Sequence, residues 1–284
     1  MTICLGAARL AIHALHAELT LYPKPGLVSL VDTGSHDDMD ALTFMRSLFS
    51  LRHYFADICK AGMEDAPFAR LKQLGIAAEA RMMAATRGIN THRGAIFSLG
   101  LLCAALGRKF AQRHPQQSQT AIDPQSLRSA LTESWGGALS AHVQGATADG
   151  SHGQRAAALH AASGAREEGA LGLPSVFCVG LPALQATLAR GGSMTQARID
   201  ALFALMASVS DTNVLHRGGA DGARMVRDSA QLFIDLGGTR NPEWQAHALQ
   251  CHRQFVRHKL SPGGAADLLS ATCLVHAFTT HDWP

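Results

Sequence analysis

Aromatic residues are scarce in this chain, at only 6% of its 284 residues. Valine and isoleucine are also sparse, whereas alanine is frequent along the whole sequence. Strands favour β-branched and aromatic side chains, while alanine and leucine favour helices. The composition therefore argues against a sheet and predicts an all-α fold.

Charged residues are few as well, at 17%, against 47% hydrophobic residues. A disordered chain would need the opposite balance, so a globular core is expected. The formal net charge is only +3, and the basic residues are scattered rather than gathered in a block. This pattern excludes a typical nucleic-acid-binding surface but is compatible with small anionic ligands such as nucleotides.

Paired cysteines and recognised metal motifs are missing. The six cysteines stand singly in apolar segments and none forms a C-x-x-C pair, which predicts buried free thiols in a reducing cytosol. The 15 histidines include no H-E-x-x-H motif. His36-Asp37, with His13 or His16, faintly resembles the H…HD…D pattern of helical metal phosphohydrolases, although the pattern is short.

Secretion and membrane signals are weak too. The N-terminus carries only Arg9 before an Ala/Leu stretch, which is not the layout of a signal peptide. Residues 169–189 contain no charge and are long enough to cross a bilayer, but Pro174 and Pro182 interrupt them. We therefore expect a buried helix pair there, no membrane association, and a cytoplasmic protein.

Apolar residues recur at helical spacing along most of the chain, and no linker divides it. This pattern predicts a single domain over 1–284, with roughly ten or more helices and an active site formed by helix-end loops. The expected helices cover 3–21, 36–52, 65–87, 93–108, a segment that starts at 123–124, and then 154–163, 175–190, 195–209, 222–236, 241–258 and 264–281.

Polar residues concentrate in five loops between these helices, where function usually resides. In the first loop, Pro23-Lys24-Pro25-Gly26 is a rigid turn that could present the Lys24 ammonium to phosphate, or merely connect two helices. Asp37 and Asp40 follow, three residues apart, which on a helix would place them on one face. They could hold Mg²⁺ together with ATP phosphates, or Asp37 could simply favour the positive end of a helix.

The second loop places Asn90, Thr91, His92 and Arg93 at a helix N-terminus, where exposed N–H groups favour anions. Asn90 or Thr91 can be an ordinary cap. Capping gives no reason for Arg93 in the first turn, where the helix dipole disfavours a cation, so an anionic partner is expected.

The remaining loops are also rich in polar residues and glycine. Arg166 and Glu167 form either a weak surface pair or part of a site. Residues 211–219 resemble the wall of a polar site. Residues 260–269 begin with a Ser-Pro cap, and Gly263 and Gly264 would let a ligand approach the backbone.

Taken together and in order, these segments resemble the triphosphoribosyl-dephospho-CoA synthase family. The matching motifs are Pro-Lys-Pro-Gly-Leu-Val at 23–28, Gly-Ser-His-Asp-Asp-Met-Asp at 34–40, Asn-Thr-His-Arg-Gly-Ala-Ile-Phe at 90–97, Gly-Ala-Arg-Glu-Glu at 164–168, Asp-Thr-Asn at 211–213 with Arg-Gly-Gly at 217–219, and Ser-Pro-Gly-Gly-Ala-Ala-Asp-Leu-Leu at 261–269. The resemblance implies an all-α enzyme that joins the triphosphoribosyl part of ATP to the 2'-hydroxyl of 3'-dephospho-CoA and releases adenine.

The resemblance also implies roles for residues. Catalytic candidates are Asp211, Glu167 and Asp267, with Asp40 a further candidate base; Asp211 is favoured because Thr212 and Asn213 beside it can orient a ribose. Candidates for substrate binding are Lys24, His36, Asn90, His92, Arg93, Arg166, Asn213, Arg217, Gly263 and Gly264, and candidates for Mg²⁺ are Asp37 and Asp40. An α-linked product made from β-configured ATP implies a single inverting displacement.

The sequence departs from the family pattern at a few positions. Arg93 stands where lysine is expected, Ser29 stands where an acidic residue is expected, and 145–155 match only loosely. Composition and spacing favour the malonate decarboxylase branch over the citrate lyase branch. The carrier-protein transferase and the acyl carrier subunit would then be indirect downstream partners.

Two other hypotheses about the function are compatible with the sequence. The first is a helical Mg²⁺-dependent hydrolase that cleaves an N-glycosidic or phosphate bond with water. The second is a non-enzymatic helical partner of a decarboxylase carrier subunit, which needs an exposed apolar stripe and no polar loops. Adenine release that requires dephospho-CoA would separate the transferase from both.

Overall fold

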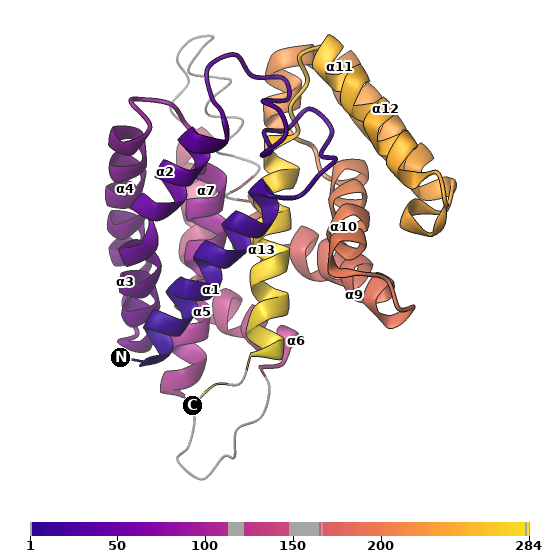
Figure 1. The fold of residues 1–284 in the computed structure, drawn as a ribbon. Coiled ribbons are helices and arrows are strands. Elements are labelled where there is room, and N and C mark those ends of the chain that lie inside the picture. The colour runs from indigo at the N-terminus through magenta and orange to yellow at the C-terminus, as the bar shows by residue number, and fades with distance from the viewer. Residues whose placement is uncertain (1, 113–121, 148–164, 166, 282, 284) are drawn as a thin grey trace.

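A computed structural model describes residues 2–112, 122–147, 165, 167–281 and 283, and these form helices and no strand (Figure 1). The all-α prediction is thereby confirmed. The longer helices are α1 (Thr2–Leu19), α2 (Ala41–Ser50), α3 (Arg52–Met63), α4 (Phe68–Ala85), α5 (Arg93–Ala111), α6 (Pro124–Leu131), α7 (Gly137–Thr147), α9 (Leu181–Ala189), α10 (Met194–Ser208), α11 (Thr212–Asp235), α12 (Trp244–Arg257) and α13 (Gly263–Thr280). Shorter turns are η1 (Thr132–Gly136), η2 (Ser175–Gly180) and η3 (Gly238–Arg240).

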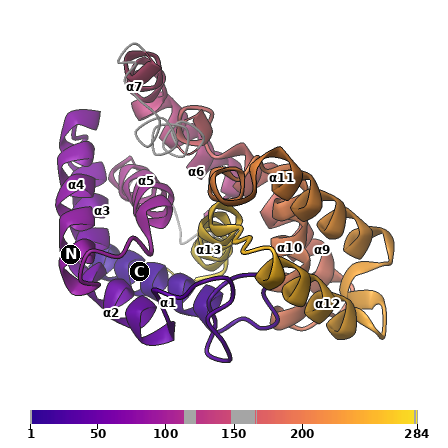
Figure 2. The ribbon, with the colours of Figure 1, turned by 90° about the horizontal axis from the view of Figure 1, so that it is seen from above.

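Helices α5 and α13 form the centre of the molecule, and both are buried along most of their length. Helix α13 packs against α1 and α5 on one side and against α10 on the other. Seen from above, α13 separates the group α1–α5 from the group α9–α12 (Figure 2). Because both central helices begin at the same end of the molecule, their N-termini can contribute to one site.

Small residues bring α3 and α5 unusually close. A Cβ atom at Gly62 would lie 2.0 Å from the carbonyl oxygen of Ala104, and one at Gly107 would lie 2.0 Å from that of Cys59. The two helix backbones therefore touch, and no larger side chain fits at either position without a shift. This contact fixes the wall of the bundle on which α5 presents its N-terminus.

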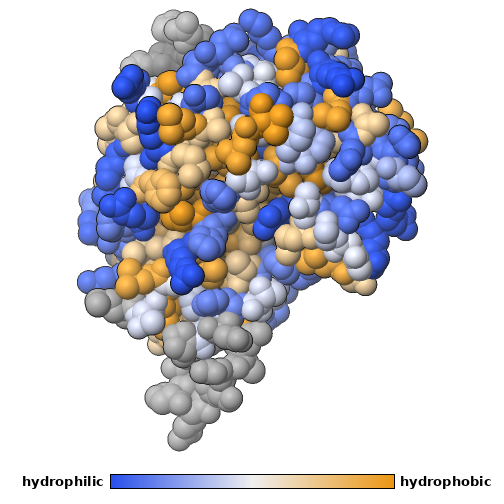
Figure 3. Space-filling model, viewed as in Figure 1, coloured by the Kyte–Doolittle hydropathy of each residue, from blue (hydrophilic) through white to orange (hydrophobic). Residues whose placement is uncertain are grey.

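The apolar character of α5 is explained by this central position. Within the described chain, α5 is the one helix long and apolar enough to cross a membrane, and 67% of it is buried inside the fold. In residues 169–189, a break at 171–173 is followed by a continuous apolar helix, Ser175–Ala189, formed by η2 and α9 and too short to count as a membrane span, so the predicted helix 175–190 is confirmed. On the face shown in Figure 3, polar residues occupy the margins and apolar residues lie toward the middle.

Several sequence expectations about helix boundaries were wrong. Residues 36–40 are not helical, because Asp40 is the N-cap of α2 and accepts a hydrogen bond from the backbone N–H of Thr43. Helix α11 begins ten residues before the expected 222, and a kink at Gly219 separates its first turns from the rest. Helix α3 was not predicted. The predicted helix that starts at 123–124 is present as α6, η1 and α7 in direct succession. The expected helix 154–163 lies outside the described residues.

The prediction of buried free thiols is confirmed at four of the six cysteines. All six are free thiols, and Cys4, Cys59, Cys103 and Cys273 are buried. Cys178, within η2, is exposed and Cys251 is half-buried, contrary to the expectation of uniformly buried thiols.

Candidate functional site

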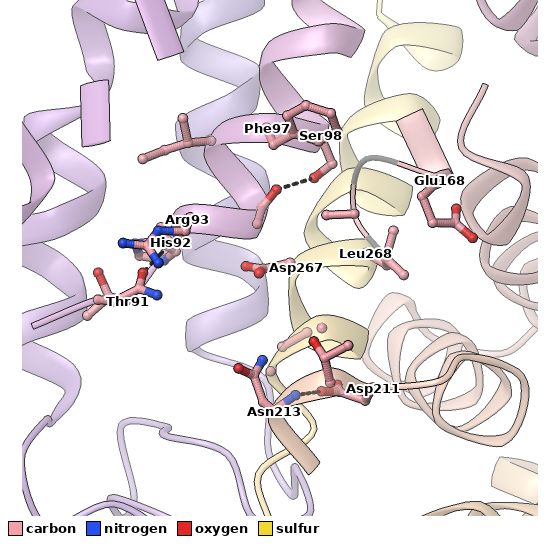
Figure 4. A pocket seen from close by; sticks show the side chains of 18 of the residues that line it. Thr91, His92, Arg93, Phe97, Ser98, Glu168, Asp211, Asn213, Asp267 and Leu268 are labelled. Carbon is pink, nitrogen blue, oxygen red and sulfur yellow. Dashed lines mark hydrogen bonds between the residues drawn. The ribbon is translucent and has the colours of Figure 1, made fainter. Parts of the chain in front are cut away.

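A pocket of about 670 Å³ lies where α5, α11 and α13 begin (Figure 4). Backbone N–H groups at a helix N-terminus lack intrahelical partners and carry a partial positive charge, so three such ends favour an anion. The polar end of the pocket includes Asn90, Arg93, Asp211, Asn213, Arg217 and Asp267. Farther along α5 the lining is mainly apolar, with Ile58, Phe68, Leu71, Ile76, Phe97 and Leu101, although Lys72, His142 and Glu167 also contribute to the pocket.

Asp211 joins two of the three helix N-termini. Its Oδ1 accepts hydrogen bonds from the backbone N–H groups of Asn213 and Val214 at the start of α11, at 2.9 and 3.3 Å. Its Oδ2 accepts one from the N–H of Ala265 in α13, at 3.1 Å. Burial raises the pKa of this carboxyl, although the backbone donors oppose the shift. The Asp211 side chain is 7% exposed and bonded to both helices, so it holds α11 and α13 together.

The glycines at the start of α13 make this junction possible. A Cβ at Gly264 would lie 2.9 Å from Oδ2 of Asp211, and one at Gly263 would lie 2.9 Å from the amide nitrogen of Asn213. The sequence suggested that these glycines admit a ligand to the backbone. In the structure it is the N-terminus of α11 that approaches them.

Asp267 lies one turn into α13 and projects toward the N-terminus of α5. A Cβ at Gly94 would lie 2.2 Å from its Oδ2, so only glycine leaves room for the carboxyl there. Burial raises the pKa of Asp267 well above its usual range, and the carboxylates of Glu18 and Asp211 add to the shift. In Figure 4 this side chain lies between His92 on one side and Glu168 on the other.

Lys24 forms a buried ion pair and does not line the pocket. Its ammonium lies 2.5 Å from Oε1 of Glu18, and the side chains are only 1% and 5% exposed. Burial lowers the pKa of Lys24 and raises that of Glu18, while each partner's charge acts in the opposite direction. Glu18 itself does line the pocket, and the sequence gave no sign of this. A contact between Lys24 and phosphate stays a prediction that would require this pair to open.

His36 and Arg217 tie the first polar loop to the loop before α13. His36 Nε2 lies 2.8 Å from the hydroxyl of Ser261, and its Nδ1 lies 3.0 Å from the Arg217 guanidinium. Arg217 also donates to the carbonyl oxygen of Ser35 at 3.0 Å. Burial and the nearby Arg217 lower the pKa of His36. His36 and Arg217, both predicted to bind substrate, line the pocket. Their side chains are hydrogen-bonded to neighbouring residues of the protein.

Asn90 and Arg93 lie at the pocket rim. Asn90 Oδ1 accepts a hydrogen bond from the backbone N–H of Arg93, the first residue of α5, at 3.2 Å, although the N-cap position itself is occupied by His92. The Arg93 guanidinium pairs with Glu79 of α4, with Nε 2.7 Å from Oε1. The anionic partner expected for Arg93 is thus present within the chain, although the arginine side chain remains half exposed.

His92 is the most deeply buried histidine of the pocket, at 2% exposure. Its Nδ1 lies 2.6 Å from the hydroxyl of Ser47 in α2, which accepts a hydrogen bond from Thr91 at 2.7 Å. Burial lowers the pKa of His92 to about 3, so the imidazole is neutral. Its Nε2 has no hydrogen-bond partner among the described residues.

The two predicted metal ligands do not share a helix face. Asp37 is 95% exposed beside Lys259, and Asp40 accepts hydrogen bonds from the backbone and hydroxyl of Thr43. These hydrogen bonds lower the pKa of Asp40. Among the described residues, no group of three His, Cys, Asp or Glu side chains is arranged to hold a metal ion. The residues present therefore do not fit a metal cage built by the protein alone.

The opposite wall carries Glu167 and Glu168. Glu167 lies exposed at the pocket, and Glu168 accepts hydrogen bonds from the hydroxyl and N–H of Ser175 at 2.6 and 3.2 Å. Arg166 lies outside the described residues. The structure thus brings most predicted site residues to one pocket and leaves Lys24, Asp37 and Asp40 away from it.

The chain is similar over nearly its whole length to one family of proteins. The family model described as CitG, ATP:dephospho-CoA triphosphoribosyl transferase, matches residues 4–284. A probable 2-(5''-triphosphoribosyl)-3'-dephosphocoenzyme-A synthase of Acinetobacter calcoaceticus is 41% identical over 263 residues, covering 93% of this chain and 87% of that protein. The 2-(5''-triphosphoribosyl)-3'-dephosphocoenzyme-A synthase of Pectobacterium atrosepticum is 37% identical over 280 residues, covering 94% and 87%.

No solved structure matches the chain. The family model spans nearly every residue, and it includes all the segments that form the pocket. The chain therefore belongs to the ATP:dephospho-CoA triphosphoribosyl transferase family, and it is a transferase.

Proposed function

We propose that this enzyme transfers the 5-triphosphoribosyl group of ATP to the 2'-hydroxyl of 3'-dephospho-CoA and releases adenine. The observation that carries the proposal is the convergence of three helix N-termini on one end of a pocket whose other end is mainly apolar. A triphosphate suits the polar end, because the guanidinium groups of Arg93 and Arg217 lie there together with the positive ends of three helix dipoles. Asp211 and Asn90 already accept hydrogen bonds from several of the N–H groups, so the arginines are the main donors left for phosphate. The apolar end suits the pantetheine arm of dephospho-CoA.

The chemistry requires one proton acceptor beside the attacking hydroxyl. The 2'-oxygen forms a bond to C1 of the ATP ribose from the α face, and the bond from C1 to adenine breaks on the β face. The hydroxyl proton passes to a carboxylate, and the departing adenine takes the bonding electron pair. Asp267 is the stronger candidate for this carboxylate. Both oxygens of Asp211 accept backbone hydrogen bonds that join two helices, whereas Asp267 accepts one from the N–H of Ala95, lines the pocket and has a pKa raised well above its usual range.

Mg²⁺ enters the proposal as the ion that accompanies ATP as part of the substrate. Its ligands would be phosphate oxygens and water, because Mg²⁺ keeps several waters and is commonly held through substrate phosphates. Asp37 stays a candidate for an outer contact, since it neighbours the pocket residue His36 in sequence. No step of the reaction depends on this assignment.

The product would serve as the prosthetic-group precursor of an acyl carrier subunit. We favour the malonate decarboxylase system over citrate lyase, on the composition and motif spacing described above, and place the enzyme in the cytoplasm. Decarboxylase subunits encoded beside this gene would support that assignment, and lyase subunits would redirect it.

Substrate dependence tests the function directly. With ATP and Mg²⁺, purified protein is expected to release adenine only when 3'-dephospho-CoA is present, measured by chromatography. Intact CoA should be a poor acceptor, because its 3'-phosphate adds bulk and charge next to the reacting hydroxyl. Equal adenine with and without dephospho-CoA would instead indicate the hydrolase, and carrier binding without any adenine release would indicate the non-enzymatic partner.

Arg93 and Glu79 offer a paired test of triphosphate binding. Arg93→Ala is expected to weaken ATP binding at least about tenfold, because a charge-assisted contact is lost. Glu79→Gln removes the carboxylate that competes with phosphate for the same guanidinium, so it should tighten ATP binding. Calorimetric titration measures both. If the two variants bind ATP as the wild type does, Arg93 has no role in the site beyond its pair with Glu79.

A further inference from the structure

His92 is a buried polar side chain that the mechanism above does not use. It is the N-cap residue of α5 and lines the pocket, yet its Nε2 has no hydrogen-bond partner among the described residues. Leaving a buried donor without a partner is destabilising, because the group has lost its hydrogen bonds to water. Such an atom at the wall of a ligand pocket points to a partner supplied by the ligand.

Two hydroxyl groups favour one ring nitrogen as the carrier of the proton. The Thr91 hydroxyl donates to the Ser47 oxygen at 2.7 Å, which leaves the Ser47 hydroxyl able to donate to Nδ1 of His92, 2.6 Å away, and this is the arrangement that we assign. With Nδ1 as an acceptor, the proton of the neutral imidazole lies on Nε2. His92 therefore has a single side-chain N–H donor, at the buried Nε2, on a ring that forms part of the pocket lining.

The surroundings of the ring favour an uncharged acceptor. The ring of Phe44 packs edge-on against His92, with centroids 5.0 Å apart, and the backbone N–H of His92 donates to the sulfur of Met82. Phosphate oxygens are better matched by the exposed guanidinium groups of Arg93 and Arg217 at the same pocket. A ring nitrogen of a purine is an uncharged acceptor of the right kind.

We propose that His92 binds the adenine of ATP, with its Nε2–H donating a hydrogen bond to a ring nitrogen of the purine. This inference rests on the proposed function. When the bond from C1 to N9 breaks, the electron pair leaves with adenine and negative charge spreads over its ring nitrogens. The donor then binds more strongly in the transition state than in the ground state. His92 keeps its own proton, because a neutral imidazole is too weak an acid to release it, and the departing adenine takes a proton from water.

Substitutions at His92 test the donor. His92→Leu is expected to lower kcat for adenine release on the order of ten- to hundredfold. His92→Gln should recover part of that loss, because its side-chain amide can place an N–H near the position of Nε2. His276→Leu is the matched control, since His276 is a half-buried histidine of α13 whose Nδ1 also lacks a partner and which does not line the pocket. It should leave kcat unchanged.

Nucleotide analogues identify the acceptor atom. The rates of wild type and His92→Leu are compared on ATP and on its 1-deaza, 3-deaza and 7-deaza analogues, each of which replaces one ring nitrogen by carbon. The loss caused by His92→Leu should shrink to less than about twofold on one analogue only. An equal loss on ATP and all three analogues, or no loss on ATP, would overturn the proposal.

An NMR measurement on the wild-type protein does not depend on whether the variants fold. It also distinguishes failure of the role of His92 from failure of the proposed function. The ¹⁵N resonance of His92 Nε2 in the wild-type protein should shift when ATP is added, and should shift less with the analogue that lacks the acceptor. Ser47→Ala should lower kcat several-fold while the protein remains folded. Failure of wild type to release adenine would overturn the proposed function, whereas an unchanged Nε2 resonance on ATP binding would overturn the role of His92.

Discussion

Asp267→Asn is expected to lower kcat for adenine release by at least about 100-fold, the usual contribution of a positioned general base. Asparagine keeps the shape of the side chain, which fits against Gly94 with no room to spare. Its amide cannot accept the proton of the attacking 2'-hydroxyl. Affinity for ATP should change little, because the loss falls on the chemical step. Adenine release under saturating substrates, with ATP affinity measured separately, checks both statements.

The pH dependence of the same variant gives an independent test. Burial and the carboxylates of Glu18 and Asp211 raise the pKa of Asp267 well above its usual range. As a base, Asp267 must be ionised, so wild-type kcat should rise with pH as this carboxyl loses its proton. The residual activity of Asp267→Asn should lack that rise. A wild-type rate that falls over this range would make Asp267 a proton donor instead.

Stability should respond in the opposite sense. Since the pKa of Asp267 is higher in the folded than in the unfolded state, the folded protein binds more protons between the two values. Its contribution to the free energy of unfolding is therefore present below the unfolded pKa, and is lost as pH rises through the folded pKa. Thermal unfolding followed from acid to neutral pH should show this decline in wild type and a weaker one in Asp267→Asn.

Local sequence signals were sufficient for the fold class and most helices. Asp123 before Pro124 correctly marked the start of α6, because capping depends on residues only a few positions apart. The cap at Asp211 was missed, since the residues around it were interpreted as a polar loop. The predicted start of α2 was wrong because several aspartates precede the helix and each could be its N-cap. Only the structure shows that the N-cap is Asp40.

Interhelical partners could not be predicted from the sequence. Glu79 lies on the neighbouring helix from Arg93, Ser47 lies 45 residues from His92, and Glu18 reaches the pocket from α1. Each contact depends on how the helices are rotated and packed, which no local pattern records. The role of a glycine is also ambiguous in the sequence, because a glycine that makes room for a ligand cannot be distinguished from one that makes room for another helix. Gly264 is an example, since the start of α11 and not a ligand approaches it.

Asp211→Ala is expected to be far more destabilising than loss of an ordinary helix cap. An N-cap aspartate contributes about 1 kcal/mol. Asp211 also accepts hydrogen bonds from α13, and removing it would leave the buried N–H of Ala265 without a partner, at about 1–3 kcal/mol. The sum is about 2–4 kcal/mol, part of which is offset by relief from burying a carboxylate. A fall in Tm of roughly 5–10 °C is expected.

Two other N-cap aspartates provide the controls. Asp40 caps only α2 and Asp123 caps only α6, so Asp40→Ala and Asp123→Ala should each lower the free energy of unfolding by about 1 kcal/mol. Urea unfolding of the three variants measures the difference that the link between α11 and α13 makes. If Asp211→Ala is no less stable than the controls but has lost adenine release, Asp211 is the general base and Asp267 is not. If it is much less stable, the carboxylate is a structural junction, and its place at the pocket follows from holding the two helix N-termini together.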